Sequence, residues 1–309
     1  MRRPLRVATR GSELARWQAT HVTGRLVEAH PGLAVDMVVV ETTGDRRADV
    51  PIWELGGQGV FVKEVESAVL DGRADFAVHS AKDLPSTTAP GLRLASIPGR
   101  DDARDALVGS TLAGLPAGAL IGTGSVRRRA QLAWLRPDLT FAGLRGNIGT
   151  RIARAGEYDA IVVAVVALRR LGLGRHVAEV LEPDVMLPQV GQGALAVECR
   201  AGDAEVASLL ATIEDSAARR AVEAERAFLA GLGGGCDLPA GAYAHDDGAG
   251  GLVIEGLIAS LDGRVLLRDR AALTGGASPA ELGGELAERL LVDAGGAALL
   301  AGVSGGPPP

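Results

Sequence analysis

Short apolar runs and longer amphipathic stretches alternate along the first eighty residues. The predicted strands are Leu5–Thr9, Val35–Val40 and Ala74–His79. Ser12 is a suitable N-cap for an amphipathic helix that runs to about Val27, and a second helix is expected over Val60–Leu70. This β-α-β-α-β order indicates a parallel sheet with helices on both faces.

The same pattern starts again after Pro98-Gly99 and changes near Asp215. The later predicted strands are Ala119–Ile121, Leu139–Ala142, Ala160–Val165 and Leu195–Cys199. A long helix is expected after Asp215, followed by three antiparallel strands and a last helix. The predicted strands are Ala240–Ala244, Leu252–Ser260 and Val265–Arg270. We therefore expect an α/β fold, with two α/β domains around a cleft and a smaller α+β C-terminal domain. The expected boundaries are 1–96 with 194–213 for domain 1, 97–193 for domain 2 and 216–309 for domain 3.

Composition narrows the class of protein. Hydrophobic residues make up 47% of the 309 residues but aromatic residues only 3%, so the cores must consist of Ala, Val, Leu and Ile. A net charge of −6 argues against a general binder of nucleic acid or membrane surfaces. We expect no membrane-spanning segment, no signal peptide and a cytoplasmic location. The two cysteines lack the spacing of a metal site or a disulfide framework, so no metal is expected.

Arginine residues gather where predicted strands end and helices begin. The residues in these strand–turn–helix segments are Arg10, Ser12, Ser125, Arg127, Arg128, Arg145, Arg151 and Arg170. A helix N-terminus offers free N–H groups, and a guanidinium group binds a carboxylate through two hydrogen bonds. A single arginine of this kind is usually a solvated surface charge. Four such segments at the ligand-binding edge of α/β sheets indicate a ligand with many carboxylates.

Lys82 and Asp83 directly follow the predicted strand that ends at His79. Lys82 can hold an anionic group, and Asp83 can stabilise a developing cation or move protons. The alternative is a surface Lys-Asp pair in a turn before Pro85, with His79 as a core residue.

Cys236 follows the glycine triplet 233–235. Three glycines leave a thiol accessible and let the backbone approach a bulky group, as around a reactive or modified cysteine. The alternative is an inert cysteine. Cys199, at the end of an apolar strand, is interpreted as structural.

These segments, in this order, resemble the porphobilinogen deaminase family over about the first 245 residues. The motifs that carry the resemblance are Ala8-Thr9-Arg10-Gly11-Ser12, Thr43-Gly44-Asp45, Gly59-Val60-Phe61-Val62-Lys63-Glu64, Ala77-Val78-His79-Ser80-Ala81-Lys82-Asp83, Arg127-Arg128, Leu144-Arg145-Gly146-Asn147, Gly191-Gln192-Gly193-Ala194 and Gly234-Gly235-Cys236. The resemblance implies three domains, the first two similar to type II periplasmic binding proteins. It implies a transferase that joins four porphobilinogen molecules into hydroxymethylbilane on a dipyrromethane cofactor, which a thioether links to Cys236.

The resemblance also implies roles for individual residues. Asp83 matches the catalytic carboxylate, which also contacts the cofactor. The matches to positions that hold cofactor carboxylates are Lys82, Ser125, Arg127 and Arg128. The matches to positions associated with porphobilinogen or the growing oligopyrrole chain are Arg10, Ser12, Arg145, Arg151 and Arg170. A monomer that binds neither nucleic acid nor membrane is expected.

Two other classes of protein could share some of these features, and the chain differs from the family's sequence pattern in one loop. A solute-binding protein would have the same two-lobed architecture but no reason for the loop before Cys236. A polyanion binder would explain the arginines but not the acidic composition and the scarcity of aromatic residues. The chain departs from the family at Glu54 and Gln58, where lysine is frequent, so a loop-lysine contact to substrate is in doubt.

Overall fold

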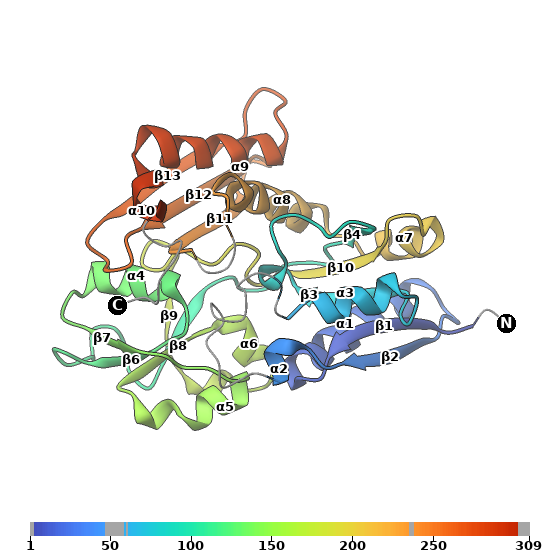
Figure 1. The fold of residues 1–309 in the computed structure, drawn as a ribbon, viewed down its shortest axis with the longest axis horizontal. Coiled ribbons are helices and arrows are strands. Elements are labelled where there is room, and N and C mark those ends of the chain that lie inside the picture. The colour runs from blue at the N-terminus through green and yellow to red at the C-terminus, as the bar shows by residue number, and fades with distance from the viewer. Residues whose placement is uncertain (1–2, 47–58, 60, 235–237, 302–309) are drawn as a thin grey trace. The chain divides into compact units, whose positions relative to one another are not determined.

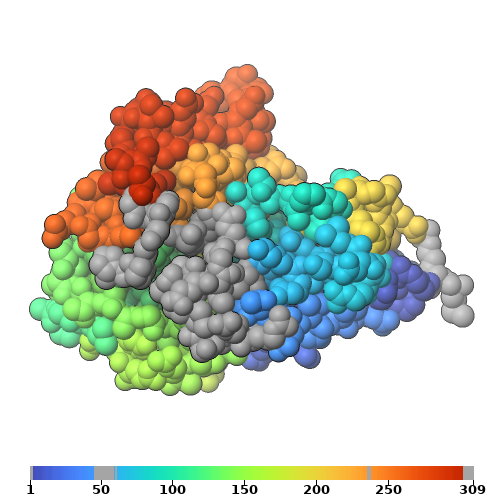
Figure 2. All heavy atoms as spheres, in the orientation of Figure 1, coloured from blue at the N-terminus to red at the C-terminus, as the bar shows by residue number. Residues whose placement is uncertain are grey.

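The computed structural model describes residues 3–46, 59, 61–234 and 238–301. The chain divides into two compact units. Unit 1 comprises Met1–Asp101 and Gly193–Arg219, and unit 2 comprises Asp102–Gln192 and Arg220–Pro309. In unit 1, the yellow residues that follow position 200 lie beside the blue and cyan residues of the first hundred positions (Figure 2). Unit 1 is therefore assembled from two stretches that are far apart in the sequence.

Unit 1 is built on a mixed five-stranded sheet (Figure 1). Its strands, in the order in which they lie side by side, are β2 (Val35–Val40), β1 (Leu5–Arg10), β3 (Phe76–Ser80), β10 (Leu195–Arg200) and β4 (Leu92–Ser96). β1 pairs with β2 and β3 in parallel, and β10 pairs with β3 and β4 in antiparallel orientation. Its helices are α1 (Glu13–Ala29), α2 (Thr43–Arg46), α3 (Lys63–Leu70) and α7 (Ala204–Ala211).

Alternation along β1 directs its side chains toward helices on both faces of this sheet. Val7 of β1 packs in a buried cluster with Val22 and Leu26 of α1. Its neighbour Ala8 packs on the opposite face with Val65 of α3. Successive strand residues point to opposite faces, so both faces of β1 are covered at its centre, where Val7 and Ala8 are buried.

Unit 2 begins with a second mixed five-stranded sheet. Its strands, in spatial order, are β7 (Thr140–Ala142), β6 (Leu120–Gly122), β8 (Ala160–Ala164), β5 (Asp105–Val108) and β9 (Val177–Leu181). β6 pairs with β7 and β8 in parallel, whereas β5 is antiparallel to β8 and β9. The helices of this part are α4 (Val126–Leu135), α5 (Ile148–Ala153) and α6 (Val165–Arg170). The two five-stranded sheets therefore have the same arrangement, with an antiparallel strand in the fourth position.

The C-terminal part of unit 2 is a three-stranded antiparallel sheet with helices. Its elements are α8 (Ser216–Gly231), which enters from unit 1, β11 (Ala240–Asp246), β12 (Leu252–Ala259), β13 (Leu266–Ala272), α9 (Pro279–Glu288) and α10 (Gly296–Ala301). Its buried cluster joins Phe228 of α8 with Ile254 of β12 and Leu286 of α9. α9 begins with a capping box, in which Ser278 and Glu281 satisfy each other's backbone N–H groups.

The α/β fold class with a small α+β C-terminal part is confirmed, and the three strands of the predicted β-α-β-α-β segment pair in parallel within the first sheet, as expected. β10 enters that sheet in the antiparallel direction. Three strands, β4, β5 and β9, were not predicted, because none has a strong local pattern of its own. The division into three domains with the boundaries given above stays a prediction.

Candidate functional site

The ends of β1 and β3 open into a pocket within unit 1. The residues that line it are Arg10, Ser12, Leu14, Ala15, Gln18, Phe61, Val78, His79, Ser80 and Asp83. The fold thus brings together three residues that the sequence nominated separately, Arg10, Ser12 and Asp83. They meet because β1 and β3 are parallel neighbours whose carboxyl ends lie at the same edge of the sheet.

Hydrogen bonds fix the two chain segments that line this pocket, the start of α1 and the turn after β3. The Ser12 hydroxyl accepts a hydrogen bond from the backbone N–H of Ala15 at 3.3 Å, which confirms Ser12 as the N-cap of α1. Gln18, one turn further along α1, donates from Nε2 to the Ser80 hydroxyl at 2.8 Å. Asp83 is the last residue of a 3-10 turn, Ala81–Asp83, that directly follows β3. Asp83 is half-buried.

Phe61 joins three of the sequence motifs. The Arg10 guanidinium lies 4.2 Å above the centre of the Phe61 ring, a favourable cation–π arrangement. A side chain at Gly44 would place its Cβ 2.2 Å from the same ring, so only glycine permits this contact. The backbone N–H of Thr43 donates to Glu64 Oε1 at 2.8 Å. The motifs around Arg10, Gly44 and Phe61 therefore form one surface.

Unit 2 contains a buried charge cluster around Asp105. Arg127 Nη2 donates to Asp105 Oδ2 at 2.8 Å, and Arg128 Nη2 donates to Asp105 Oδ1 at 2.7 Å. Gln192 Nε2 donates to Asp105 Oδ1 at 2.9 Å and to the Ala103 carbonyl at 2.6 Å. Asp105 is 0% exposed, and the two arginines are 2% and 5% exposed. The neighbouring N-cap residue Ser125 accepts from the Arg128 backbone N–H at 3.4 Å.

This cluster carries an excess positive charge. Burial by itself would raise the pKa of Asp105, but the charges of Arg127 and Arg128 outweigh burial and lower it well below its usual range. Two guanidinium cations therefore share one carboxylate, and the ion pairs among the described residues leave the cluster with an excess of one positive charge. Arg127 Nε is buried and makes no hydrogen bond among the described residues. The other Nη atoms of the two arginines donate to backbone carbonyl groups, Arg127 Nη1 to Leu187 at 2.6 Å and Arg128 Nη1 to Val162 at 3.0 Å.

The other nominated residues of unit 2 lie on separate short elements. Arg145 lies in the turn between β7 and α5, where Gly146 has a φ of +105° that favours glycine. Arg151, in α5, donates from Nε to the Gly146 carbonyl at 2.8 Å. Arg170 is the last residue of α6.

Some nominated residues cannot be placed, and others were missed. Cys236, Glu54 and Gln58 lie outside the described residues. Asp105 and the role of Gln192 were not predicted. A charged residue at the head of the apolar run Asp-Ala-Leu-Val was the available signal for Asp105, since a carboxylate in such a run must be paired.

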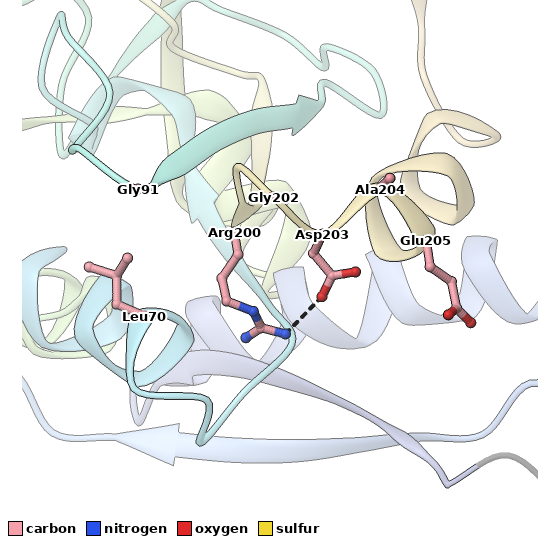
Figure 3. Close-up of a pocket in the computed structure, with 7 residues that line it drawn as sticks. All are labelled: Leu70, Gly91, Arg200, Gly202, Asp203, Ala204 and Glu205. Atoms are coloured by element: carbon pink, nitrogen blue, oxygen red, sulfur yellow. Dashed lines mark hydrogen bonds and ion pairs between the residues drawn. The ribbon is translucent and has the colours of Figure 1, made fainter.

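A shallower pocket lies elsewhere in unit 1, near the end of α3 and the start of α7 (Figure 3). The residues that line it are Leu70, Gly91, Arg200, Gly202, Asp203, Ala204 and Glu205. Arg200 donates to the carbonyls of Val69 and Ala74 at 2.9 Å each and pairs with Asp203 at 2.8 Å. The guanidinium group of Arg200 therefore ties chain segments together. Across the described part of the chain, no helix is both long and apolar enough to cross a membrane.

Comparison with known proteins places these observations in a family. The family model described as "Porphobilinogen deaminase, dipyromethane cofactor binding domain" matches residues 5–208, and the model described as "Porphobilinogen deaminase, C-terminal domain" matches residues 219–292. A porphobilinogen deaminase of Roseiflexus castenholzii is 54% identical over 308 residues, which are 98% of this chain and 100% of that protein. One of Nitratidesulfovibrio vulgaris is 47% identical and covers 94% of each chain.

Among solved structures, the periplasmic aliphatic sulphonate binding protein SsuA from Escherichia coli is 16% identical, with a TM-score of 0.39 over 74% of this chain and 72% of that one. The assignment rests instead on the two family models and the full-length relatives. Their matches run in series through both units and include the segments that carry Arg10, Asp83 and Arg127. This chain belongs to the porphobilinogen deaminase family.

Proposed function

We propose that this chain joins four porphobilinogen molecules, one at a time and with loss of ammonia, into the linear tetrapyrrole hydroxymethylbilane. As a porphobilinogen deaminase it is a transferase of tetrapyrrole biosynthesis that works with a dipyrromethane cofactor. The number of additions, the covalent attachment to Cys236 and the roles of single residues are part of the proposal.

The observation that carries the proposal is the grouping of Asp83 with Arg10 and Ser12 around one pocket. Loss of ammonia from porphobilinogen leaves positive charge on the pyrrole nitrogen. A half-buried carboxylate is the natural partner for that charge, because a fixed anion stabilises the charge as it develops. The Asp83 carboxylate would therefore act on the reacting pyrrole, and Arg10 and Ser12 would bind its carboxylates.

The dipyrromethane carboxylates would be held by Arg127 and Arg128, together with Ser125 and Lys82. The excess positive charge of the described ion pairs around Asp105 and the unbonded Arg127 Nε support this role. When bound, the cofactor supplies the free pyrrole α-carbon to which substrate is joined. Asp105 holds the two guanidinium groups in place and is itself held by Gln192, so little ordering is needed when a carboxylate binds.

Arg145, Arg151 and Arg170 would bind the growing oligopyrrole chain. Each added pyrrole brings two carboxylates, so later additions need cationic groups beyond those that hold the cofactor. We also propose a monomer in a reducing cytoplasmic compartment, which accords with the buried free thiol of Cys199. Light scattering during size-exclusion chromatography and cell fractionation test these two points.

Intact-protein mass spectrometry tests the proposed function. The purified protein should exceed its sequence mass by two deaminated porphobilinogen units, and porphobilinogen should add further units in steps. Cys236→Ala should remove the excess mass. Cys199→Ala is the matched control and should keep the excess, because that thiol is buried within unit 1. An adduct that persists in Cys236→Ala, or a wild-type protein that neither carries an adduct nor consumes porphobilinogen, would contradict the proposal.

A further inference from the structure

The antiparallel pair β3 and β10 carries buried charged groups at both ends. At the end remote from the pocket, Asp75 accepts hydrogen bonds from Arg3 Nη1 and from the Arg6 backbone N–H, both at 2.8 Å. Arg200, at the end of β10, lies 3.6 Å from the same carboxylate. Figure 3 shows Arg200 at this end of the strand, directed toward Asp203. This end is a network of fully charged groups that links the N-terminal segment to the sheet.

The end nearer the pocket carries His79 and Glu198. The register pairs His79 with Ala196, so Glu198 lies two residues further along β10 on the same face. His79 Nε2 lies 3.3 Å from Glu198 Oε2, and the two side chains are 4% and 1% exposed. Neither atom has a hydrogen-bond partner among the described residues. The two polar atoms are therefore buried against each other.

A third titratable group completes this cluster from the helix that covers the same face. Glu66 of α3 is 8% exposed. Burial and, secondly, the charge of Glu198 raise the pKa of Glu66, while His79 opposes them. The β10–β4 ladder shifts register between Val197 and Glu198. The residue left out of this pairing is Ala95 of β4, and Glu198 keeps its regular place opposite Ala77 of β3.

Stabilisation of the fold does not by itself explain the buried His79–Glu198 pair. Apolar residues of similar volume in place of a buried ionic pair often leave a protein as stable as before, or more so. A buried polar pair can instead specify one strand register, because a slip of one residue turns every side chain of the strand to the other face. The register of β3 matters for the reaction because the chain passes directly from His79 through Ser80 into the turn that ends at Asp83. His79 itself lines the pocket with Asp83.

We propose that His79 and Glu198, with Glu66 packed over them, are positioning residues that fix the register of β3 on β10 and so place the Asp83 carboxylate. A slip of one residue would move Asp83 along the strand axis by about 3.3 Å. The backbone hydrogen bond of 3.0 Å from Ala81 to the carbonyl of Ala194, the residue before β10, depends on the same register. This inference rests on the proposed function, since it assigns these residues to the reaction at Asp83.

The double variant His79→Met/Glu198→Met tests the inference in the full-length protein. Both substitutions are apolar and remove the two partners of the buried pair together, so the thermal midpoint should be equal to that of the wild type or higher. The kcat of loaded protein should fall about tenfold or more, with a smaller change in KM. The rate at which porphobilinogen loads freshly made apoprotein, followed by intact mass, should fall by a similar factor, because loading uses the same turn.

If the double variant fails to fold, two single variants at His79 test the same inference. His79→Gln retains a group that can donate to Glu198 and should keep kcat within about threefold of the wild type, whereas His79→Leu should lose about tenfold. Asp75→Asn is the matched control at the other end of the strand pair. It should lower the thermal midpoint and leave the kcat of loaded protein unchanged.

Three results would overturn the inference: a folded double variant with a kcat within twofold of the wild type, equal losses in His79→Gln and His79→Leu, or a loss in Asp75→Asn as large as in the double variant. A wild-type protein without adduct or porphobilinogen consumption would instead overturn the proposed function. The two failures are therefore distinguishable.

Discussion

Replacement of Asp105 by Asn removes the carboxylate that Arg127 and Arg128 share in the interior of unit 2. Both guanidinium groups lie within 2.8 Å of this carboxylate, which is completely buried. The substitution leaves two buried cations whose other hydrogen-bond acceptors, among the described residues, are the neutral carbonyl groups of Leu187 and Val162. Removal of one partner of a buried ion pair costs about 3–5 kcal/mol, so Asp105→Asn should reduce the free energy of unfolding by that amount at pH 7.

Urea unfolding of Cys236→Ala protein is the appropriate assay, because a bound cofactor would add its own stabilisation to the folded state. Asp138→Asn is the matched control. Its partner Arg136 follows α4, the same helix that carries Arg127, and lies 2.7 Å away, but these two side chains are 27% and 38% exposed. A surface pair of this kind contributes about 0–1 kcal/mol.

The pH dependence of the same comparison follows from the lowered pKa of Asp105. A carboxyl group whose pKa is lower in the folded than in the unfolded state stabilises the fold above its unfolded pKa of about 3.9, and this contribution is lost as the pH falls below that value. The stability difference between wild type and Asp105→Asn should be constant from pH 5 to 8 and shrink below about pH 4. A loss below about 1 kcal/mol at pH 7, or an equal loss in Asp138→Asn, would refute the reasoning.

Three further predictions concern the reaction and the buried cluster of unit 1. Asp83→Asn should lower the kcat of cofactor-loaded protein by about 10²–10³ with less effect on KM, because about 4 kcal/mol of charge stabilisation is lost; retention of half the activity would identify a mere surface pair. Arg145→Leu and Arg170→Leu should load cofactor normally but accumulate partly extended chains in native mass spectra, and a wild-type distribution of species would exclude their role in elongation. Glu66 has a raised pKa, so the folded state holds its proton longer and the stability contribution of Glu66 should fall as the pH rises above its unfolded pKa of about 4.3. The stability of Glu66→Gln relative to wild type should therefore increase with pH in urea titrations, and a pH-independent difference would contradict the raised pKa.

The strands and helix starts that rest on local signals were well predicted from the sequence. Val35–Val40 is a strand at the predicted residues, since its β-branched run needs no distant information. Ser12 caps α1 as predicted, because an N-cap is a contact over three residues. The weakly patterned strands β4, β5 and β9 were missed, because their strand conformation depends on pairing with distant segments.

The predicted site residues were likewise identified only from local sequence patterns. Arg10, Ser12 and Asp83 were nominated one by one from turns at strand ends, and the parallel pairing of β1 and β3 brings them to one pocket. The antiparallel entry of β10 was not predictable from the local pattern, because strand direction depends on the path of the chain between the two units.

The sequence by itself determined the chemical inventory: a carboxylate after β3, arginines at the starts of helices and a cysteine after three glycines. Only the tertiary structure decided which charged groups lie next to one another in the folded protein. Asp105, 22 residues before Arg127 and 23 before Arg128, accepts hydrogen bonds from both guanidinium groups in the interior of unit 2. Likewise Glu198 reaches His79 only because β10 returns to the first sheet after more than a hundred residues. Charges interact through space, and strongly in the low dielectric constant of a protein interior. The electrostatic environment of a buried group is therefore set by the residues that folding brings near it, whatever their distance along the chain.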